Sequence, residues 1–367
     1  MATENKVNVG IIGTGNISSI YLESPKKFEI LNIVAVADID LGRAQAQADK
    51  YGVPKACSPD ELLADPSIEI VINLTIPMAH GDVALKALEA GKSVYNEKPL
   101  AYDQAQAKAM LALAKKKKLL VGGAPDTFLG GGLQTCRSLI DAGAIGTPVY
   151  VHGQMLTRGM ESWHPNPEFF FQPGGGPMFD MGPYYLTAMI ALLGPATAVS
   201  GSTRIVHPER TVTSQPLYGT QIQVNTPTTI MGLIDFANGT IGTLATSFDV
   251  SEGYAIGLTI HGTQAVLQVP DPNTFGGPVR IKRADAKEFE EVPIEHRWIE
   301  NSRGLGVADM AYALRNRRPH RANGALASHA LEMMHAFHES ARKGKRITLK
   351  TKCAQPAPLA ANFPDSE

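Results

Sequence analysis

The sequence predicts an α/β protein with a doubly wound parallel sheet at its N-terminal end, followed by an α/β domain with a large, mostly antiparallel open sheet. Apolar, strand-like runs alternate with helix-like segments through the first third of the chain, and repeated alternation of this kind builds a parallel sheet with helices on both faces. Long segments with alternating apolar and polar residues follow, separated by hairpin-like turns. The 367 residues are enough for two domains.

The first domain is expected at residues 1–123. Strand-like runs occupy 7–12, 31–37, 69–74, 93–95 and 119–121, and helix-like segments occupy 16–22, 41–51, 79–90 and 103–118. Ser58-Pro59 is typical of a further helix start, since proline is tolerated in the first turn after a capping residue. Gly52 and Gly91 mark helix ends, where glycine readily adopts the left-handed conformation.

The second domain is expected at residues 124–350, with a tail at 351–367. Helices are predicted at 128–142 and 181–193, with a loop at 158–177 and strands at 148–157, 198–205, 228–236, 240–248, 255–261 and 265–269. Asn238-Gly239 and Gly262-Thr263 indicate hairpin turns. Two helices, at 302–317 and 325–343, are expected to close this sheet, and the Pro- and Ala-rich tail from Gln355 is expected to be poorly ordered.

Composition excludes several classes of function. The 34 basic and 35 acidic residues leave a net charge of -1, which argues against a nucleic-acid binder. Cys57, Cys136 and Cys353 are too few and too scattered for a disulfide framework or a zinc site, and no metal is expected. No apolar run approaches the roughly 18 residues of a membrane span. Because the polar N-terminus does not resemble a signal peptide, we expect a cytoplasmic protein.

A glycine-rich turn lies between the first strand and the first helix. The segment Gly13-Thr14-Gly15-Asn16-Ile17-Ser18 follows a buried strand; Gly13 permits the tight turn and Gly15 leaves room for a pyrophosphate. Asp38 ends the next strand about 20 residues later, where an acidic side chain binds the adenosine ribose, although it could instead cap the helix at Leu41. These features predict a Rossmann-type dinucleotide site.

Asp38 also favours NAD over NADP, because a carboxylate repels the extra phosphate of NADP. Ile39, the next residue, offers that phosphate no partner, whereas Arg43 is close enough to keep NADP as the alternative.

Glu97-Lys98-Pro99 follows the strand at 93–95, where chemistry gathers in a doubly wound sheet. A lysine beside a nicotinamide can have its pKa lowered by burial and by the positive charge of the oxidised ring. It can then accept a proton from an alcohol and donate one in the reverse direction. Taken alone, however, this tripeptide is also a common exposed turn.

Five motifs in register resemble the Gfo/Idh/MocA oxidoreductases over almost the whole chain. They are Gly13-x-Gly15, Asp38, the segment Asn73-Leu74-Thr75-Ile76-Pro77 with His80, Glu97-Lys98-Pro99, and Gly174 to Tyr184. The resemblance implies a dinucleotide-binding domain followed by an α/β domain with an open sheet, with Lys98 as the catalytic lysine and a cis bond before Pro99. It also implies that Glu97 contacts the nicotinamide ribose, and that Thr75, Pro77 and His80 line the cofactor's path together with the turn residues Gly13, Thr14, Gly15, Asn16 and Ile17. In this family the outer face of the second sheet usually builds a dimer or tetramer.

Asp180 and Tyr184 are four residues apart, a spacing that places them on one face of a helix start. Many members of the family have His at the position of Tyr184. A phenol titrates near pH 10 and is a poor proton acceptor at neutral pH, so Tyr184 is interpreted as a hydrogen-bond donor to the substrate oxygen, with Asp180 orienting the substrate or the lysine. Alternatively, Asp180 caps a helix and Tyr184 is a core aromatic.

Further substrate contacts are expected from the loop that begins at Arg158. Trp163 and His164 suit a carbohydrate, with an aromatic face for C–H groups and a partner for hydroxyls; alternatively these aromatics only anchor the loop. Asp126 and Thr127, at the start of the second domain, are candidate substrate or cofactor contacts. His329, His335 and His338 are interpreted as structural or surface residues, with pocket contacts as the alternative.

The sequence therefore predicts an NAD-dependent enzyme that moves a hydride between nicotinamide and a secondary alcohol of a sugar, polyol or glycoside, as a homodimer or homotetramer without a nucleic-acid or membrane partner. One alternative keeps the cofactor but cleaves a glycoside without net redox change, through a transient keto-sugar. Another is a non-catalytic NAD-sensing regulator, but such a protein is expected to lack the lysine, and Lys98 is present.

Overall fold

The chain forms two units in a computed structural model that describes residues 6–251 and 256–367. Unit 1 comprises Met1–Leu129, Asn301–Leu331 and Asn362–Glu367, and unit 2 comprises Gly130–Glu300 and Glu332–Ala361. The continuous boundaries expected at 123 and 350 differ from these units, because two C-terminal segments return to unit 1. Each unit is described by itself.

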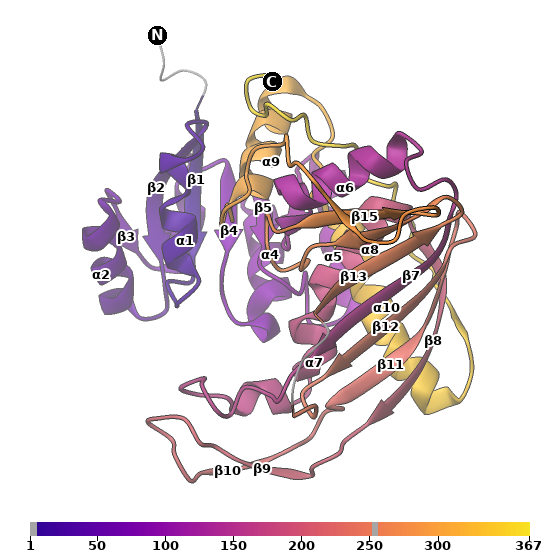
Figure 1. The fold of residues 1–367 in the computed structure, drawn as a ribbon. Coiled ribbons are helices and arrows are strands. Elements are labelled where there is room, and N and C mark those ends of the chain that lie inside the picture. Colours follow the sequence, from indigo (N-terminus) through magenta and orange to yellow (C-terminus); the bar gives the residue numbers. More distant parts are fainter. Residues whose placement is uncertain (1–5, 252–255) are drawn as a thin grey trace. The chain divides into compact units, whose positions relative to one another are not determined.

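Unit 1 contains a six-stranded parallel sheet in the order β3-β2-β1-β4-β5-β6 (Figure 1). Its strands are β1 (Val7–Ile12), β2 (Leu31–Ala37), β3 (Ala56–Cys57), β4 (Ile70–Asn73), β5 (Ser93–Asn96) and β6 (Val121–Gly123). Its helices are α1 (Ser18–Leu22), α2 (Leu41–Tyr51), α3 (Pro59–Ala64), α4 (His80–Glu89), α5 (Gln104–Lys117), α9 (Leu305–Asn316) and the first part of α10 (Gly324–Lys343), with short 3-10 turns η1 (Ser24–Lys26), η2 (Pro77–Ala79) and η3 (Thr127–Leu129). The predicted doubly wound sheet is confirmed.

The central strands read as apolar runs because both faces of a parallel sheet are covered, and every residue of β4 and β5 is buried. Two of the predicted helix ends are confirmed by their caps. Ser58 and Glu61 form a reciprocal capping box at the start of α3. Gly52 ends α2 with a φ of 70°, in the left-handed region that favours glycine.

Helix α9 belongs to unit 1, so the prediction that residues 302–317 close the second sheet is wrong. The carboxylate of Asp126 accepts hydrogen bonds from the backbone N–H groups of Gly304 (3.0 Å) and Gly306 (2.9 Å), at the start of α9. The helix packs against β6. The sequence pattern located the helix but carried no signal for this long-range cap.

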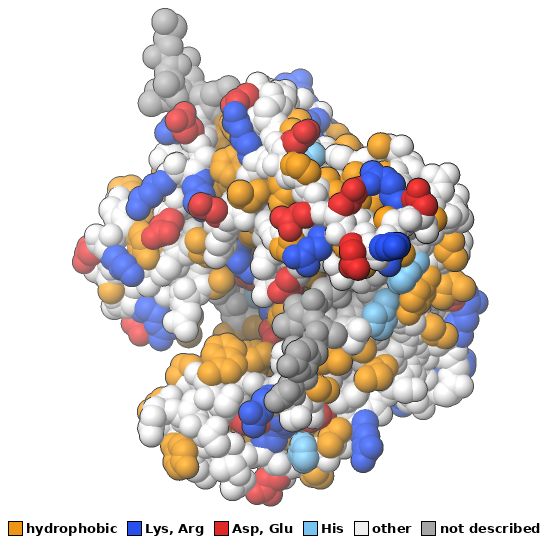
Figure 2. All heavy atoms as spheres, viewed as in Figure 1, with side chains coloured by type: hydrophobic (Ala, Val, Ile, Leu, Met, Phe, Trp, Pro, Cys, Tyr) orange, Lys and Arg blue, Asp and Glu red, His pale blue; other side chains and the backbone are white. Residues whose placement is uncertain are grey.

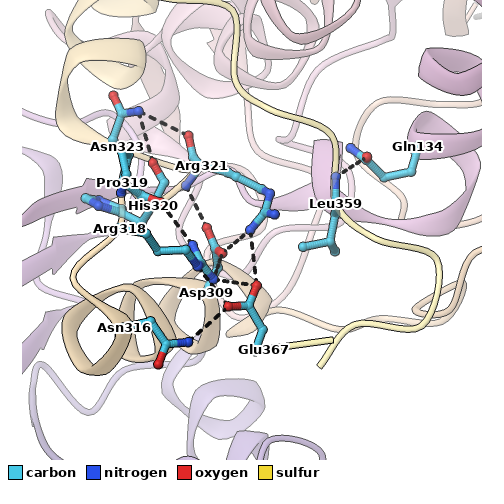
Figure 3. Close-up of polar contacts among 10 residues, drawn as sticks. All are labelled: Gln134, Asp309, Asn316, Arg318, Pro319, His320, Arg321, Asn323, Leu359 and Glu367. Atoms are coloured by element: carbon cyan, nitrogen blue, oxygen red, sulfur yellow. Dashed lines mark hydrogen bonds and ion pairs between the residues drawn. The ribbon is translucent and has the colours of Figure 1, made fainter. Parts of the chain in front are cut away.

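The tail is anchored, so the prediction that it is poorly ordered is also wrong. Leu359 donates its N–H to the side chain of Gln134 within unit 2 (2.7 Å; Figure 3). In unit 1, Phe363 is fully buried, and Glu367 forms ion pairs with Arg318 (2.7 Å) and Arg321 (3.8 Å). Both arginines also pair with the buried carboxylate of Asp309 (2.8 and 2.5 Å; Figure 3).

Unit 2 contains a nine-stranded sheet in the order β16-β15-β14-β13-β7-β12-β11-β8-β17. Among the strand pairs of this sheet that the described residues form, only β7·β12 is parallel, so the predicted mostly antiparallel sheet is confirmed. Its strands are β7 (Pro148–Leu156), β8 (Ala196–Arg204), β11 (Thr229–Phe236), β12 (Ile241–Ser247), β13 (Ile256–Gly262), β14 (Ala265–Val269), β15 (Val279–Arg283), β16 (Glu290–Val292) and β17 (Ile347–Thr348), and β9 (Glu209–Thr211) pairs with β10 (Gln221–Gln223) in a separate hairpin. The sequence prediction missed β9, β10, β16 and β17, which are too short to show a clear period. It also missed β15, although Val279 and Ile281 alternate there with basic residues.

The helices of unit 2 are α6 (Gly131–Asp141), α7 (Gly176–Asp180), α8 (Gly182–Leu193), the end of α10 and a 3-10 turn, η4 (Glu168–Phe171). Every residue of α8 is buried, and the helix packs against β7. The single helix expected at 128–142 begins only at Gly131, because Gly130 is extended (ψ 156°). The strand expected at 255–261 corresponds to β13; Ala255 lies outside the described residues.

Among the residues that the structure describes, no helix is both long enough and apolar enough to cross a membrane. Figure 2 shows acidic and basic side chains mixed over the visible face.

Candidate functional site

The glycine-rich turn follows β1 at the carboxyl edge of the unit 1 sheet. Gly13 has a φ of 98°, and a Cβ there would lie 2.6 Å from the carbonyl carbon of Leu74. Only glycine therefore fits this crossing of two strand ends. A Cβ on Gly15 would meet no atom within 4 Å, which leaves open space beside the backbone. Asn16 and Ile17 are exposed next to it.

Asp38 follows β2 and connects it to the glycine-rich turn. Its carboxylate accepts hydrogen bonds from the Thr14 backbone N–H (2.8 Å), the Thr14 hydroxyl (2.9 Å) and the Asp40 N–H (3.0 Å). Burial raises the pKa of Asp38, but these hydrogen bonds outweigh it and hold the pKa below its ordinary value. The side chain is thus anionic at neutral pH. The expected cap of α2 is supplied by Asp40 instead.

Arg43 is already paired with carboxylates. Its guanidinium lies 4.0 Å from Asp38 and 3.6 Å from Asp40. A phosphate at this edge would therefore compete with two acidic side chains for one partly exposed arginine. The arrangement fits a ribose hydroxyl better than a phosphate.

Apolar side chains are exposed at the same carboxyl edge. They are Ile17, Ile39, Ile76 and Met78, which follow β1, β2 and β4, and Ile39 is 97% exposed. A group of exposed apolar side chains at the end of a sheet indicates a ligand-binding surface. Such side chains can pack against the flat faces of a base and a nicotinamide. The prediction of site residues did not include Ile76 or Met78. The available signal was an apolar residue directly after a strand end.

Two buried asparagines connect the ends of β4 and β5. Asn73 donates from its side-chain amide to Asn96 (3.0 Å) and to the carbonyl of His80 (3.0 Å), and its side-chain oxygen accepts the Thr75 hydroxyl (2.7 Å). Asn96 donates to the carbonyl of Leu100 (2.7 Å). This network fixes both loops that leave the strands, and the roles of Asn73 and Asn96 in it were missed.

His80 contacts the backbone of the same two loops. Its Nδ1 lies 2.6 Å from the carbonyl of Pro99, and its Nε2 lies 2.9 Å from the carbonyl of Thr75. Burial lowers the pKa of His80 below its ordinary value, although both carbonyls favour the protonated ring. His80 therefore braces the loops that carry Thr75, Pro77 and Lys98.

The catalytic candidate Lys98 follows β5 in a half-buried turn. Its backbone N–H donates to the Glu97 carboxylate (2.8 Å), whose other oxygen accepts the hydroxyl of buried Tyr21 (2.8 Å). The bond between Lys98 and Pro99 is cis, as expected. Glu97 and Lys98 thus leave the strand in a defined direction, at the same edge as the glycine-rich turn and Asp38.

Asp126 and Thr127 are almost fully buried, at 1% and 2% exposure. Asp126 uses its carboxylate to cap α9, so the structure favours a structural role over the expected substrate contact. Burial raises the pKa of Asp126 to about 6, against the lowering effect of the Gly306 and Gly304 N–H groups and of Arg303.

The remaining candidates lie in unit 2. Asp180 ends α7 and Tyr184 lies in the first turn of α8, so the two residues occupy successive helices instead of one face of a single helix. The cap position of α8 is Met181, not Asp180. Asp180 is half-buried and Tyr184 is buried.

The aromatic loop after β7 presents Trp163 to solvent, at 62% exposure. His164 packs edge-on against Trp163 and Phe170, with ring centroids 5.5 and 5.2 Å apart. Arg158 is exposed. Trp163 and His164 therefore form a ridge with one exposed aromatic ring, the arrangement expected for binding the C–H face of a sugar.

Two histidines of α10, His335 and His338, pack against the helix that ends at Asp180. The Phe179 ring lies 5.0 Å from His335 and 5.4 Å from His338, and burial together with His335 lowers the pKa of His338 to about 4. His329 is fully buried. Within residues 6–251 and 256–367, no group of three His, Cys, Asp or Glu side chains could hold a metal ion.

The parallel sheet, the glycine-rich turn and Asp38 define a Rossmann-type, dinucleotide-binding protein. A family model described as "Oxidoreductase family, NAD-binding Rossmann fold" matches residues 7–123, and the "GFO/IDH/MocA C-terminal domain" matches residues 133–268. The chain belongs to the GFO/IDH/MocA family of oxidoreductases, and the resemblance seen in the sequence is confirmed.

Similar proteins include polyol dehydrogenases. Inositol 2-dehydrogenase of Salmonella paratyphi B is 33% identical over 171 residues, which cover 45% of this chain and about half (51%) of that relative. The scyllo-inositol 2-dehydrogenase (NAD(+)) of Bacillus subtilis is 26% identical over 96% of this chain and 98% of its own. Among solved structures, apo levoglucosan dehydrogenase shares the fold, with a TM-score of 0.84, 22% identity, and coverage of 95% of this chain and 100% of its own.

The buried carboxyl of Asp126 makes stability depend on pH. Its pKa is about 6 in the folded protein and about 4 in an unfolded chain. The stability that the raised pKa contributes is complete below pH 4 and is lost as the pH rises through 6. Relative to Asp126→Asn, whose amide oxygen can still accept both N–H groups, the wild type should lose about 1.4 kcal/mol per unit of pKa difference across this window.

Urea unfolding of both proteins between pH 4 and 7 measures this difference. A stability difference that is the same at every pH would show that the carboxyl of Asp126 does not titrate in this window.

Proposed function

We propose that the protein is an NAD-dependent dehydrogenase that acts on a secondary alcohol of a sugar, polyol or glycoside. The observation that carries the proposal is the placement of Lys98, in a turn held by Asn73, Asn96 and His80, at the same sheet edge as the glycine-rich turn and Asp38. The names of the inositol dehydrogenases among the relatives support the substrate class.

The cofactor residues all lie at the carboxyl edge of the unit 1 sheet. We assign Gly13, Thr14, Gly15, Asn16 and Ile17 to the pyrophosphate and the turn around it, Asp38 to the adenosine ribose, Thr75, Pro77 and His80 to the cofactor's path, and Glu97 to the nicotinamide ribose. The open space beside Gly15 and the anionic carboxylate of Asp38 fit NAD. When bound, NAD supplies the hydride acceptor for oxidation and, as NADH, the donor for reduction.

Lys98 acts as the general acid/base for the reacting hydroxyl. A neutral lysine amine accepts this proton during oxidation, and the ammonium returns it during reduction. We assign Tyr184 as a hydrogen-bond donor to the substrate oxygen and Asp180 as the residue that orients the hydroxyl. Arg158, Trp163 and His164 bind the remainder of the polyol, with the exposed indole of Trp163 against its C–H face.

The active form is a homodimer or homotetramer built on the large sheet of unit 2. Support comes from apolar side chains that remain exposed on one face of its strands: Met231, Leu233 and Ile241, each 47–52% exposed. Water-exposed apolar side chains on neighbouring strands favour burial against a second copy. The cytoplasmic location of the protein is a prediction from the sequence.

Removing the charge of Asp38 should change the choice of dinucleotide. In Asp38→Asn, the side-chain oxygen still accepts from Thr14 while the repulsion of an added phosphate is lost. The ratio of the Kd for NADPH to the Kd for NADH, measured by fluorescence titration, should fall by about tenfold or more, equivalent to about 1.4 kcal/mol.

The matched control is Asp49→Asn, which removes an exposed carboxylate within α2 and leaves an amide oxygen that can still accept from Gln45. An equal change in the two variants would contradict the specific role of Asp38.

Replacing Lys98 should abolish turnover without abolishing cofactor binding. The purified protein is screened with NAD and then NADP against inositols, aldoses, anhydrosugars and glycosides, with reduced dinucleotide as the readout. In Lys98→Met, kcat should fall about 10²- to 10⁴-fold, while the Kd for NADH stays within a few fold. The control is Lys86→Met, at an exposed position of α4.

Turnover by Lys98→Met at the wild-type rate would exclude Lys98 as the acid/base. A wild type that forms no reduced dinucleotide but cleaves glycosides would replace the proposal with the redox-neutral reaction. No reaction of either kind would leave the NAD-sensing regulator.

A further inference from the structure

Arg210, in β9 of unit 2, is buried at 8% exposure although it is a charged residue on a short, polar strand. Its guanidinium contacts acceptors on two sides. One terminal nitrogen donates to the carbonyl of Arg158 (3.1 Å) and pairs with Glu161, and the other donates to the carbonyl of Phe248 (2.9 Å) and pairs with Asp249. A buried charge with this many partners is held in a single arrangement.

These partners come from segments far apart in the sequence. Arg158 and Glu161 belong to the aromatic loop that follows β7, whereas Phe248 and Asp249 follow β12. The guanidinium also lies over the ring of Phe171, 5.1 Å from its centroid, in the 3-10 turn at the other end of the loop. Arg210 therefore connects both ends of the aromatic loop to the sheet.

The backbone of the loop is shaped around this arginine. Gly159 has a φ of 100°, and a Cβ there would lie 2.9 Å from Nη1 of Arg210 and 2.4 Å from the Glu161 carboxylate. Any side chain at this position would have to displace the ion pair. The glycine and the arginine thus form one fitted arrangement.

The segment after β9 attaches to the same stretch of the loop. The backbone N–H groups of Thr213 and Ser214 donate to the carbonyl of Glu161 (2.8 and 3.1 Å), and the Ser214 hydroxyl donates to the carbonyl of His164 (2.5 Å). Trp163 lies between these two attachment points, and its indole is exposed. The loop is fixed on both sides of the aromatic ridge, and the ridge itself faces solvent.

Electrostatics makes the guanidinium the essential member of this arrangement. It separates two carboxylates, Glu161 and Asp249, which are both largely buried. Without the cation these two carboxylates would be buried with no counter-charge, a costly state that is relieved when one of them takes up a proton or when the loop moves. A lysine keeps the charge but cannot span both carboxylates with a planar, forked donor.

We propose that Arg210 is a positioning residue that sets the affinity for the polyol by holding Trp163 and His164 in their binding orientation. The inference rests on the proposed function, in which these two side chains bind the substrate. It adds a specificity-determining residue that touches neither substrate nor cofactor.

The test compares Arg210→Met and Arg210→Lys with Arg346→Met as the matched control. Arg346 is also an ion-paired arginine of unit 2, 2.8 Å from Asp235, but its side chain is exposed. Within residues 6–251 and 256–367 it forms no ion pair or side-chain hydrogen bond with the aromatic loop. For Arg210→Met, the KM for the best polyol of the screen should rise about 10- to 100-fold. The kcat and the Kd for NADH should stay within a few fold, and Arg210→Lys should be intermediate.

A second measurement reports the mobility of the aromatic loop and does not depend on enzyme activity. The chain has two tryptophans, Trp163 and Trp298, so a Trp298→Phe background leaves Trp163 as the single reporter. Its fluorescence anisotropy should fall in Arg210→Met and stay unchanged in Arg346→Met.

An unchanged KM in Arg210→Met would overturn the proposal, even if the anisotropy falls, because the loop would then move without affecting the substrate. Equal losses of kcat and of NADH binding would also overturn it, since they indicate general misfolding. A wild type that turns over no polyol refutes the proposed function; the anisotropy then decides by itself whether Arg210 holds the loop.

Discussion

The structure of unit 1 depends on satisfying the polar groups at the carboxyl ends of its parallel strands. Backbone N–H and C=O groups lose their sheet partners where β4 and β5 end, and they are buried there. Asn73, Asn96 and His80 supply the missing partners. Because these side chains bind the carbonyls of the outgoing loops, they also determine where Thr75 and Lys98 lie. The hydrogen bonds that satisfy these buried backbone groups therefore also position the candidate catalytic lysine.

In unit 2, ion pairs instead of neutral side chains hold a loop in place. The aromatic loop has little regular structure, and its backbone is held by Arg210, Glu161 and Asp249. In both units, buried polar side chains hold a segment that carries proposed binding or catalytic residues. Asn73, Asn96 and Arg210 have no direct role in the proposed reaction, whereas His80 is also assigned to the cofactor's path. This division fits the general observation that function resides on loops positioned by a rigid scaffold.

The sequence predicted those features that depend on local patterns. Apolar runs located β1, β2 and β4, and Ser58 and Gly52 marked helix ends, because capping and burial act over a few residues. Features set by distant contacts escaped prediction: Asp126 caps a helix that begins at residue 305, and Arg210 lies in a polar strand with no periodicity. Asp180 and Tyr184 were expected on one helix face, but α7 ends at Asp180 and a separate helix, α8, begins at Gly182. Long-range partners of single polar side chains leave no trace in local spacing.

The central claim is that a hydride moves between a secondary carbinol carbon and NAD while Lys98 handles the proton. It is tested most directly by incubating the wild type with NAD and inositol deuterated on its ring carbons, and then measuring the mass of the reduced dinucleotide by mass spectrometry. The account predicts reduced dinucleotide that carries one deuterium per ketone formed, with Lys98→Met forming neither product. Ketone formed without label in the dinucleotide, or label transfer at the wild-type rate in Lys98→Met, would contradict it.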